Sequence, residues 1–77
     1  MAGFIRINLF ATLAAKLPDD ADRFPIEENT SVADVLADLQ IPDHQAKLIF
    51  VNGRKTAKEV RLKDGDRLGI FPPVGGG

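Results

Sequence analysis

The sequence has 77 residues with a formal net charge of -1 at pH 7, and it contains no cysteine. This length accommodates one small domain, and the absence of cysteine excludes disulfides, thiolate metal sites and a cysteine nucleophile. The nearly balanced charge and the lack of a long apolar segment argue against nucleic acid and membranes as partners, so we expect a cytoplasmic protein.

The chain begins with a predicted strand followed by a short helix. Residues 4–10, FIRINLF, alternate with the two-residue period of a strand, and Ile5, Ile7 and Leu9 form one of its faces. The next segment, ATLAAKL, consists of good helix formers but leaves space for only one or two turns before a proline. We therefore expect a short helix or a loop after the first strand.

A second strand and the main helix are predicted next. The segment DRFPIEE is typical of a short strand that pairs with the first, and Pro25 favours the sheet edge because proline cannot donate to a ladder. In TSVADVLADLQI, Thr30 or Ser31 can cap a helix, and Ser31 and Asp34 have nearly the spacing of a capping box. The apolar stripe of this helix is formed by Val32, Val35, Leu36 and Leu39.

Two chain reversals and two further strands are predicted in the last third of the chain. KLIFVNGRK places apolar strand formers before Asn52 and Gly53, a residue pair that favours a tight hairpin. LKDGDRL predicts another turn before the last apolar run, Leu68 to Phe71. Pro72 and Pro73 then end the sheet, because neither has a backbone N–H.

This order of elements predicts an α+β protein with the β-grasp, or ubiquitin-like, fold. A mixed sheet of four to five strands packs on one main helix, and the last strand returns beside the first. We expect the folded domain to span residues 1–73 and a flexible glycine tail to span residues 74–77. Alternation assigns the core to Ile5, Ile7, Leu9, Val32, Val35, Leu36, Leu39, Leu48, Phe50, Leu68 and Ile70, and the opposite face of the sheet to Phe4, Phe10, Ile49 and Phe71.

Three motifs in the second half of the chain resemble those of a known family. VNG in a hairpin, LKDGD before the final strand and FPPVGGG at the end are together similar to the small subunit of molybdopterin synthase, a ubiquitin-like sulfur carrier. The resemblance covers the whole chain in element order, but its specific residues lie within positions 51–77. It implies a sulfur-carrying subunit without catalytic side chains of its own.

The resemblance also implies which residues act. Gly77 would carry the reactive carboxylate, which an E1-like adenylating enzyme activates with ATP and a sulfur donor protein converts to a thiocarboxylate. Gly75 and Gly76 would form the thin tail that enters the active sites of partners, among them the large subunit of molybdopterin synthase. We expect no bound cofactor. The expected partner-binding residues are Phe4, Phe10, Ile49, Phe71, Pro72, Pro73 and Val74.

Other functions remain open at this stage. Glycine at position 75 is more similar to carriers of the thiamin pathway, so sulfur transfer for thiazole synthesis is an alternative. A protein modifier, in which a lysine amine captures the activated Gly77, is a second alternative, and a bare interaction module with an inert tail is a third.

Few side chains are candidates for chemistry. Asp64 and Asp66 flank a glycine, and this pattern favours a role in a turn over acid–base catalysis. His44, the single histidine, lies between the main helix and the next strand, where we expect it on the solvated surface. We predict no metal site.

Overall fold

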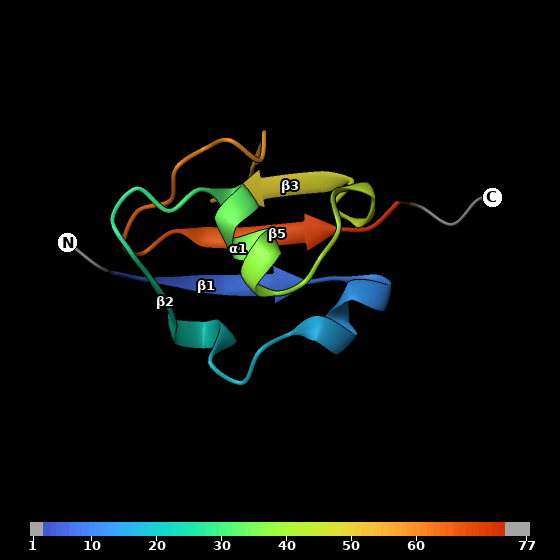
Figure 1. Ribbon diagram of the computed structural model, residues 1–77, viewed down its shortest axis with the longest axis horizontal. Helices are drawn as coiled ribbons and strands as arrows, with labels where there is room; N and C mark the ends of the chain where they lie inside the picture. Colours follow the sequence, from blue (N-terminus) through green and yellow to red (C-terminus); the bar gives the residue numbers. More distant parts are fainter. Residues whose placement is uncertain (1–2, 74–77) are drawn as a thin grey trace.

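The first and last strands lie side by side and parallel at the centre of a five-stranded sheet (Figure 1). The computed structural model describes residues 3–73, and the strand order is β2-β1-β5-β3-β4. All other strand pairs are antiparallel. The strands are β1 (Gly3–Leu9), β2 (Phe24–Ile26), β3 (Leu48–Val51), β4 (Arg54–Thr56) and β5 (Arg67–Phe71). The predicted α+β fold of the β-grasp type is confirmed, and β2 with Pro25 lies at the edge as expected.

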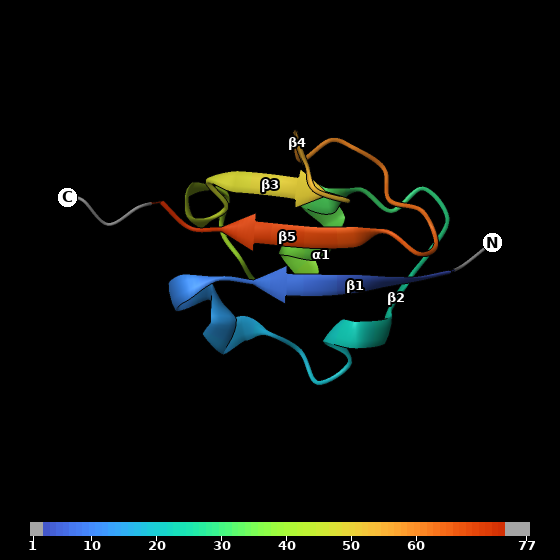
Figure 2. The ribbon, with the colours of Figure 1, turned by 180° about the vertical axis from the view of Figure 1, so that it is seen from behind.

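One α-helix, α1 (Val32–Asp38), covers one face of the sheet and leaves the other face open (Figure 2). Ser31 caps this helix: its hydroxyl accepts a hydrogen bond from the Asp34 N–H at 3.1 Å, and the Asp34 carboxylate accepts one from the Ser31 N–H at 3.0 Å. The predicted capping box is therefore present. Three short 3-10 helices complete the described chain, namely η1 (Ala11–Lys16), η2 (Ala21–Arg23) and η3 (Asp43–Gln45).

The core lies between α1 and the sheet. Eight of the residues predicted for it are buried: Ile5, Ile7, Leu9, Val32, Val35, Leu36, Leu68 and Ile70. Leu39 is half-buried against this cluster. The connecting segments add buried residues that the sequence pattern did not indicate, namely Leu13, Ala21, Ile41 and Leu62. Ile26 of the edge strand is buried as well.

The two faces of β3 were predicted the wrong way round. Ile49 was expected on the open face with the partner-binding residues, but only 7% of it is exposed. It lies directly across from Ile70, which is fully buried, and paired residues in neighbouring strands point to the same face. Phe50 was expected in the core and instead faces outward, where it pairs with Gly69. Leu48 is half-buried across from Phe71 and is likewise not a core residue.

Two aspartates hold the turn that leads into β5. The Asp66 carboxylate accepts hydrogen bonds from the Asn52 side-chain amide at 2.9 Å and from the Lys63 N–H at 2.8 Å. Asn52 also accepts a bond from the Arg67 N–H at 3.0 Å. Asn52 and Gly53 have positive φ angles of 54° and 83°, as a two-residue hairpin requires, so the predicted β3–β4 turn is confirmed.

The same turn is fastened to the start of β1. Asp64 accepts a hydrogen bond from the Phe4 N–H at 2.9 Å, and the Gly65 N–H donates to the Phe4 carbonyl at 2.8 Å. Gly3 permits this approach, because a Cβ there would lie 2.7 Å from the Cβ of Asp64. The start of β5 is thus fixed against both β1 and the β3–β4 hairpin.

Candidate functional site

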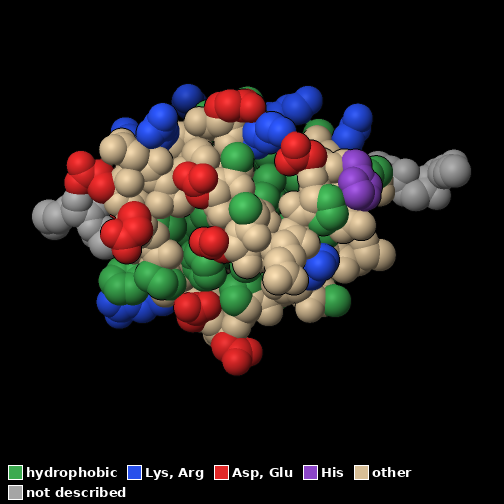
Figure 3. Space-filling view, in the orientation of Figure 1, with side chains coloured by type: hydrophobic (Ala, Val, Ile, Leu, Met, Phe, Trp, Pro, Cys, Tyr) green, Lys and Arg blue, Asp and Glu red, His purple; other side chains and the backbone are tan. Residues whose placement is uncertain are grey.

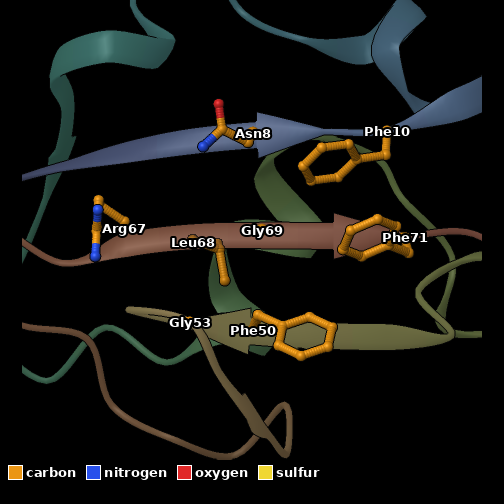
Figure 4. Close-up of a pocket in the computed structure, with 8 residues that line it drawn as sticks. All are labelled: Asn8, Phe10, Phe50, Gly53, Arg67, Leu68, Gly69 and Phe71. Carbon is orange, nitrogen blue, oxygen red and sulfur yellow. The ribbon is translucent and has the colours of Figure 1, made fainter.

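The face of the sheet opposite α1 is the candidate site, since the predicted partner-binding residues of β1 and β5 lie there. Alternate residues of β1 point outward, as its burial pattern shows. The outward residues of β5 are Arg67, Gly69 and Phe71, and Phe50 joins them from β3. Figure 4 shows these side chains across the three central strands.

Three phenylalanine rings gather where β5 ends (Figure 4). The rings of Phe10 and Phe71 stack with centroids 4.1 Å apart and planes 2° from parallel. Phe50 meets Phe71 edge to face, at a centroid distance of 5.6 Å. Phe10 is 40% exposed, so this aromatic cluster (Phe10, Phe50, Phe71) offers apolar surface to a partner.

Gly69 forms the floor of a shallow hollow beside the aromatic cluster. The hollow has a volume of about 260 Å³, and Asn8 and Arg67 also line it. A Cβ at Gly69 would lie 3.5 Å from the Phe10 ring, at ordinary contact distance. A small side chain would therefore fit here, whereas a larger one would fill the hollow.

Phe4 lies apart from the aromatic cluster. It lies near the start of β1, six residues before Phe10, which directly follows the strand; this corresponds to about 20 Å along an extended chain. Its ring is 42% exposed, and the Arg23 guanidinium lies 4.3 Å from the ring centroid. The structure thus brings Phe10 and Phe71 together, leaves Phe4 at the far end of β1 and excludes Ile49 from this face.

β5 ends at Phe71, and two prolines follow it. The Lys47 N–H donates to the Phe71 carbonyl at 2.9 Å, which is the last sheet bond of this strand within residues 3–73. Pro72 is half-buried and Pro73 is exposed. The remaining predicted site residues, Val74, Gly75, Gly76 and Gly77, lie outside the described residues.

The other candidate residues have structural or surface positions. Asp64 and Asp66 act as hydrogen-bond acceptors in the turn, as predicted, and His44 is exposed in η3. Residues 3–73 contain no group of three or more His, Cys, Asp or Glu side chains that could hold a metal ion. No helix in this part of the chain is both long enough and apolar enough to cross a membrane.

The β-grasp fold with an open aromatic sheet face defines a ubiquitin-like protein. The family model described as the ThiS family matches residues 7–77, and the chain belongs to this family of ubiquitin-like sulfur carriers. At this level its function is that of a sulfur carrier or a ubiquitin-like modifier. A search of curated proteins gave no significant match.

Solved structures resemble the chain over nearly its full length. SAMP1 from Haloferax volcanii is 26% identical with a TM-score of 0.66, and the match covers 97% of this chain and 100% of that one. A putative molybdopterin converting factor subunit 1 from Pyrococcus furiosus is 26% identical with a TM-score of 0.63, covering 94% and 99%. The HVO 2177 protein of Haloferax volcanii, at 22% identity and a TM-score of 0.75, covers 99% and 88% and shares the fold.

Proposed function

We propose that this protein is a sulfur carrier for molybdopterin synthesis, whose Gly77 carboxylate is adenylated and then converted to a thiocarboxylate. The observation that carries the proposal is the position of Phe71: it closes β5 within the aromatic cluster and is followed directly by Pro-Pro-Val and three glycines. The surface available for docking and the chain end that would react are therefore joined by one strand.

The molybdopterin branch is favoured by two observations. The sequence Phe71-Pro72-Pro73 is the part of the ending that resembles molybdopterin carriers. The Pyrococcus furiosus match is itself described as a subunit of a molybdopterin converting factor. A Helicobacter pylori complex of subunits 1 and 2 of such a factor, 24% identical over the whole of both chains with a TM-score of 0.53, shares the fold. By analogy, we propose a large synthase subunit as a partner.

The proposed chemistry needs no side chain of this protein. A Gly77 carboxylate oxygen attacks the α-phosphorus of ATP in the E1-like enzyme, an oxygen–phosphorus bond forms, and pyrophosphate leaves. A sulfide-level nucleophile supplied by the sulfur donor protein then attacks the carbonyl carbon, and AMP leaves. Four extended residues after Pro73 reach about 13 Å, so the enzyme must dock against the body close to the end of β5.

The aromatic cluster is the proposed docking surface. Phe10 and Phe71 were predicted for this role, and Phe50 takes the place that the sequence pattern gave to Ile49. Stacked and edge-to-face rings present a rigid apolar surface, and aromatic residues are enriched where partners bind. The enzyme and the large subunit would use the same surface in turn, since both must reach the same chain end.

Reconstitution tests the proposal. The protein is incubated with its cognate adenylating enzyme, ATP and a sulfur source, and intact-protein mass is measured. We expect a product in which sulfur replaces one oxygen, and a variant that lacks Gly76 and Gly77 should remain unmodified although it stays folded. Transfer of this sulfur to a pterin precursor in the presence of the large subunit would support the molybdopterin branch. Transfer to a thiazole precursor instead would favour the thiamin branch.

A protein modifier is the second candidate function. It is favoured by the similarity to SAMP1, which extends over 97% of this chain. In this function a lysine amine attacks the Gly77 adenylate or a thioester formed from it, and an isopeptide bond results. Peptides that carry a glycine remnant on lysine, found in cells that express the protein, would support this candidate. Their absence, together with thiocarboxylate formation, would favour the carrier.

A further inference from the structure

Two arginines lie next to each other at the start of the central strand pair. Arg6 of β1 is the register partner of Arg67 of β5, and both are exposed on the open face. They line one hollow of about 300 Å³, together with Phe4, Gly65 and Asp22. Like charges directly opposite each other in neighbouring strands destabilise a sheet, so this arginine pair (Arg6, Arg67) is unfavourable for the isolated domain.

Within residues 3–73, neither arginine of the pair forms a salt bridge. A salt bridge joins Lys58 to Asp43, away from this face. Asp22 contributes the carboxylate of the hollow, yet it forms no ion pair with either arginine. Destabilising contacts between like charges, with no opposite charge paired to them, are expected mainly at functional sites.

The charge of the whole domain is divided between its two faces. Although the net charge is -1, the open face carries the arginine pair, Lys55 across from Phe50, and Arg23 over the ring of Phe4. On the helix side, Asp34 and Asp38 are exposed on α1. Figure 3 shows Asp and Glu side chains spread over that face, with Lys and Arg mainly at its margins. A partner that docks on the open face therefore meets a positive surface.

We propose that the arginine pair recognises carboxylates on the adenylating enzyme. The enzyme surface that faces this sheet would then carry acidic side chains next to the apolar region that contacts the aromatic cluster. The inference rests on the proposed function, because it needs an enzyme that acts on the chain end. Strand geometry sets the layout: Arg67 precedes Gly69 by two residues and Phe71 by four, or about 7 and 13 Å along β5. The acidic group thus binds at the end of the sheet away from the tail and fixes the direction of docking.

Steady-state adenylation with the cognate enzyme, measured as pyrophosphate release at varied carrier concentration, tests this inference. We expect Arg67→Glu and Arg6→Glu to raise KM for the carrier about tenfold or more with kcat nearly unchanged, because a charge reversal weakens docking rather than chemistry. Arg67→Lys keeps the charge but loses the planar guanidinium fork, so its KM should rise less than that of Arg67→Glu. Salt raised from about 0.05 to 0.5 M should increase the wild-type KM more than that of Arg67→Glu.

Arg54→Glu is the matched control. Arg54 is exposed on β4 across from Val51, which packs against the core side, so this reversal alters the net charge equally but not the open face. Equal KM changes in Arg54→Glu and Arg67→Glu would overturn the inference. So would wild-type self-association that Arg67→Glu abolishes, because the face would then bind a second copy. An enzyme that adenylates its reference carrier but not this protein would instead refute the proposed function. Circular dichroism confirms folding, and the glutamine variant at the same position replaces any charge reversal that unfolds the domain.

Discussion

Replacing Ile49 and Phe50 separately should have opposite consequences, although the two residues are neighbours on β3. Ile49 is 7% exposed and packs across from Ile70, so truncation to alanine removes buried methyl groups and leaves a cavity. Such changes destabilise by about 2 to 5 kcal/mol. A domain of this size has a stability of about 4 to 11 kcal/mol, so Ile49→Ala should lower it severely. Ile49→Val should lower it by only about 0.5 to 1.5 kcal/mol.

Phe50→Ala should affect binding more than stability. Phe50 is half-buried on the open face, and its ring contact with Phe71 contributes about 0.5 to 1.5 kcal/mol beyond area burial. Because the half-burial of the ring adds to this contact, we expect a total loss of about 1 to 3 kcal/mol in unfolding free energy, with a clear rise in KM for adenylation. The assay is urea unfolding followed by circular dichroism, because the chain has neither Trp nor Tyr for fluorescence. A larger stability loss for Phe50→Ala than for Ile49→Ala would refute the face assignment.

Three further changes separate binding from folding. Gly69→Leu should fill the hollow beside Phe10 and weaken partner binding in calorimetry, and unchanged affinity would show that no partner group enters it. Asp66→Ala removes two hydrogen bonds from the turn before β5 and should cost about 1 to 3 kcal/mol in urea unfolding. A folded variant that lost adenylation with unchanged stability would contradict this structural role. The Ser31 N–H bond lowers the pKa of Asp34 from its usual value of 3.8, so its ionised form stabilises the fold above that pH, and this contribution is lost as the pH falls through the lowered pKa. The stability difference between the wild type and Asp34→Asn should therefore shrink below about pH 4, and a difference that persists in acid would contradict the linkage.

The sequence predicted elements well wherever polar residues interrupt the apolar ones. In β1, Arg6 and Asn8 stand between the buried residues, so alternation fixes both the strand and its faces. Ser31 with Asp34 and the Asn52-Gly53 pair are local signals whose geometry needs no distant contact, and all of them appear in the structure. The β-grasp topology followed from the order of these elements.

Long-range pairing decided what the sequence left undetermined. LIFV in β3 has no polar residue, so its faces are set only by the register with β5, which places Ile49 against Ile70. The hollow at Gly69 likewise depends on Phe10 and Phe50 from neighbouring strands. The arginine pair is separated by 60 residues in sequence and meets only because β1 and β5 are parallel. No pattern within one segment could have predicted these juxtapositions.

A glycine tail presents an activating enzyme with backbone and a carboxylate, and many chains could offer the same groups. Under the proposed function, the enzyme must therefore distinguish one carrier from another by contacting the folded domain. The surface that it contacts has to lie within reach of the reacting chain end. β5 meets this requirement, since it places Arg67, Gly69 and Phe71 on one face and continues into the prolines before the tail. Fixing its start through Asp64 and Asp66 then fixes the recognition surface and the exit of the tail together. A substitution in that turn should consequently lower both the selectivity for partners and the efficiency with which the tail reaches an active site, although the turn itself contacts no partner.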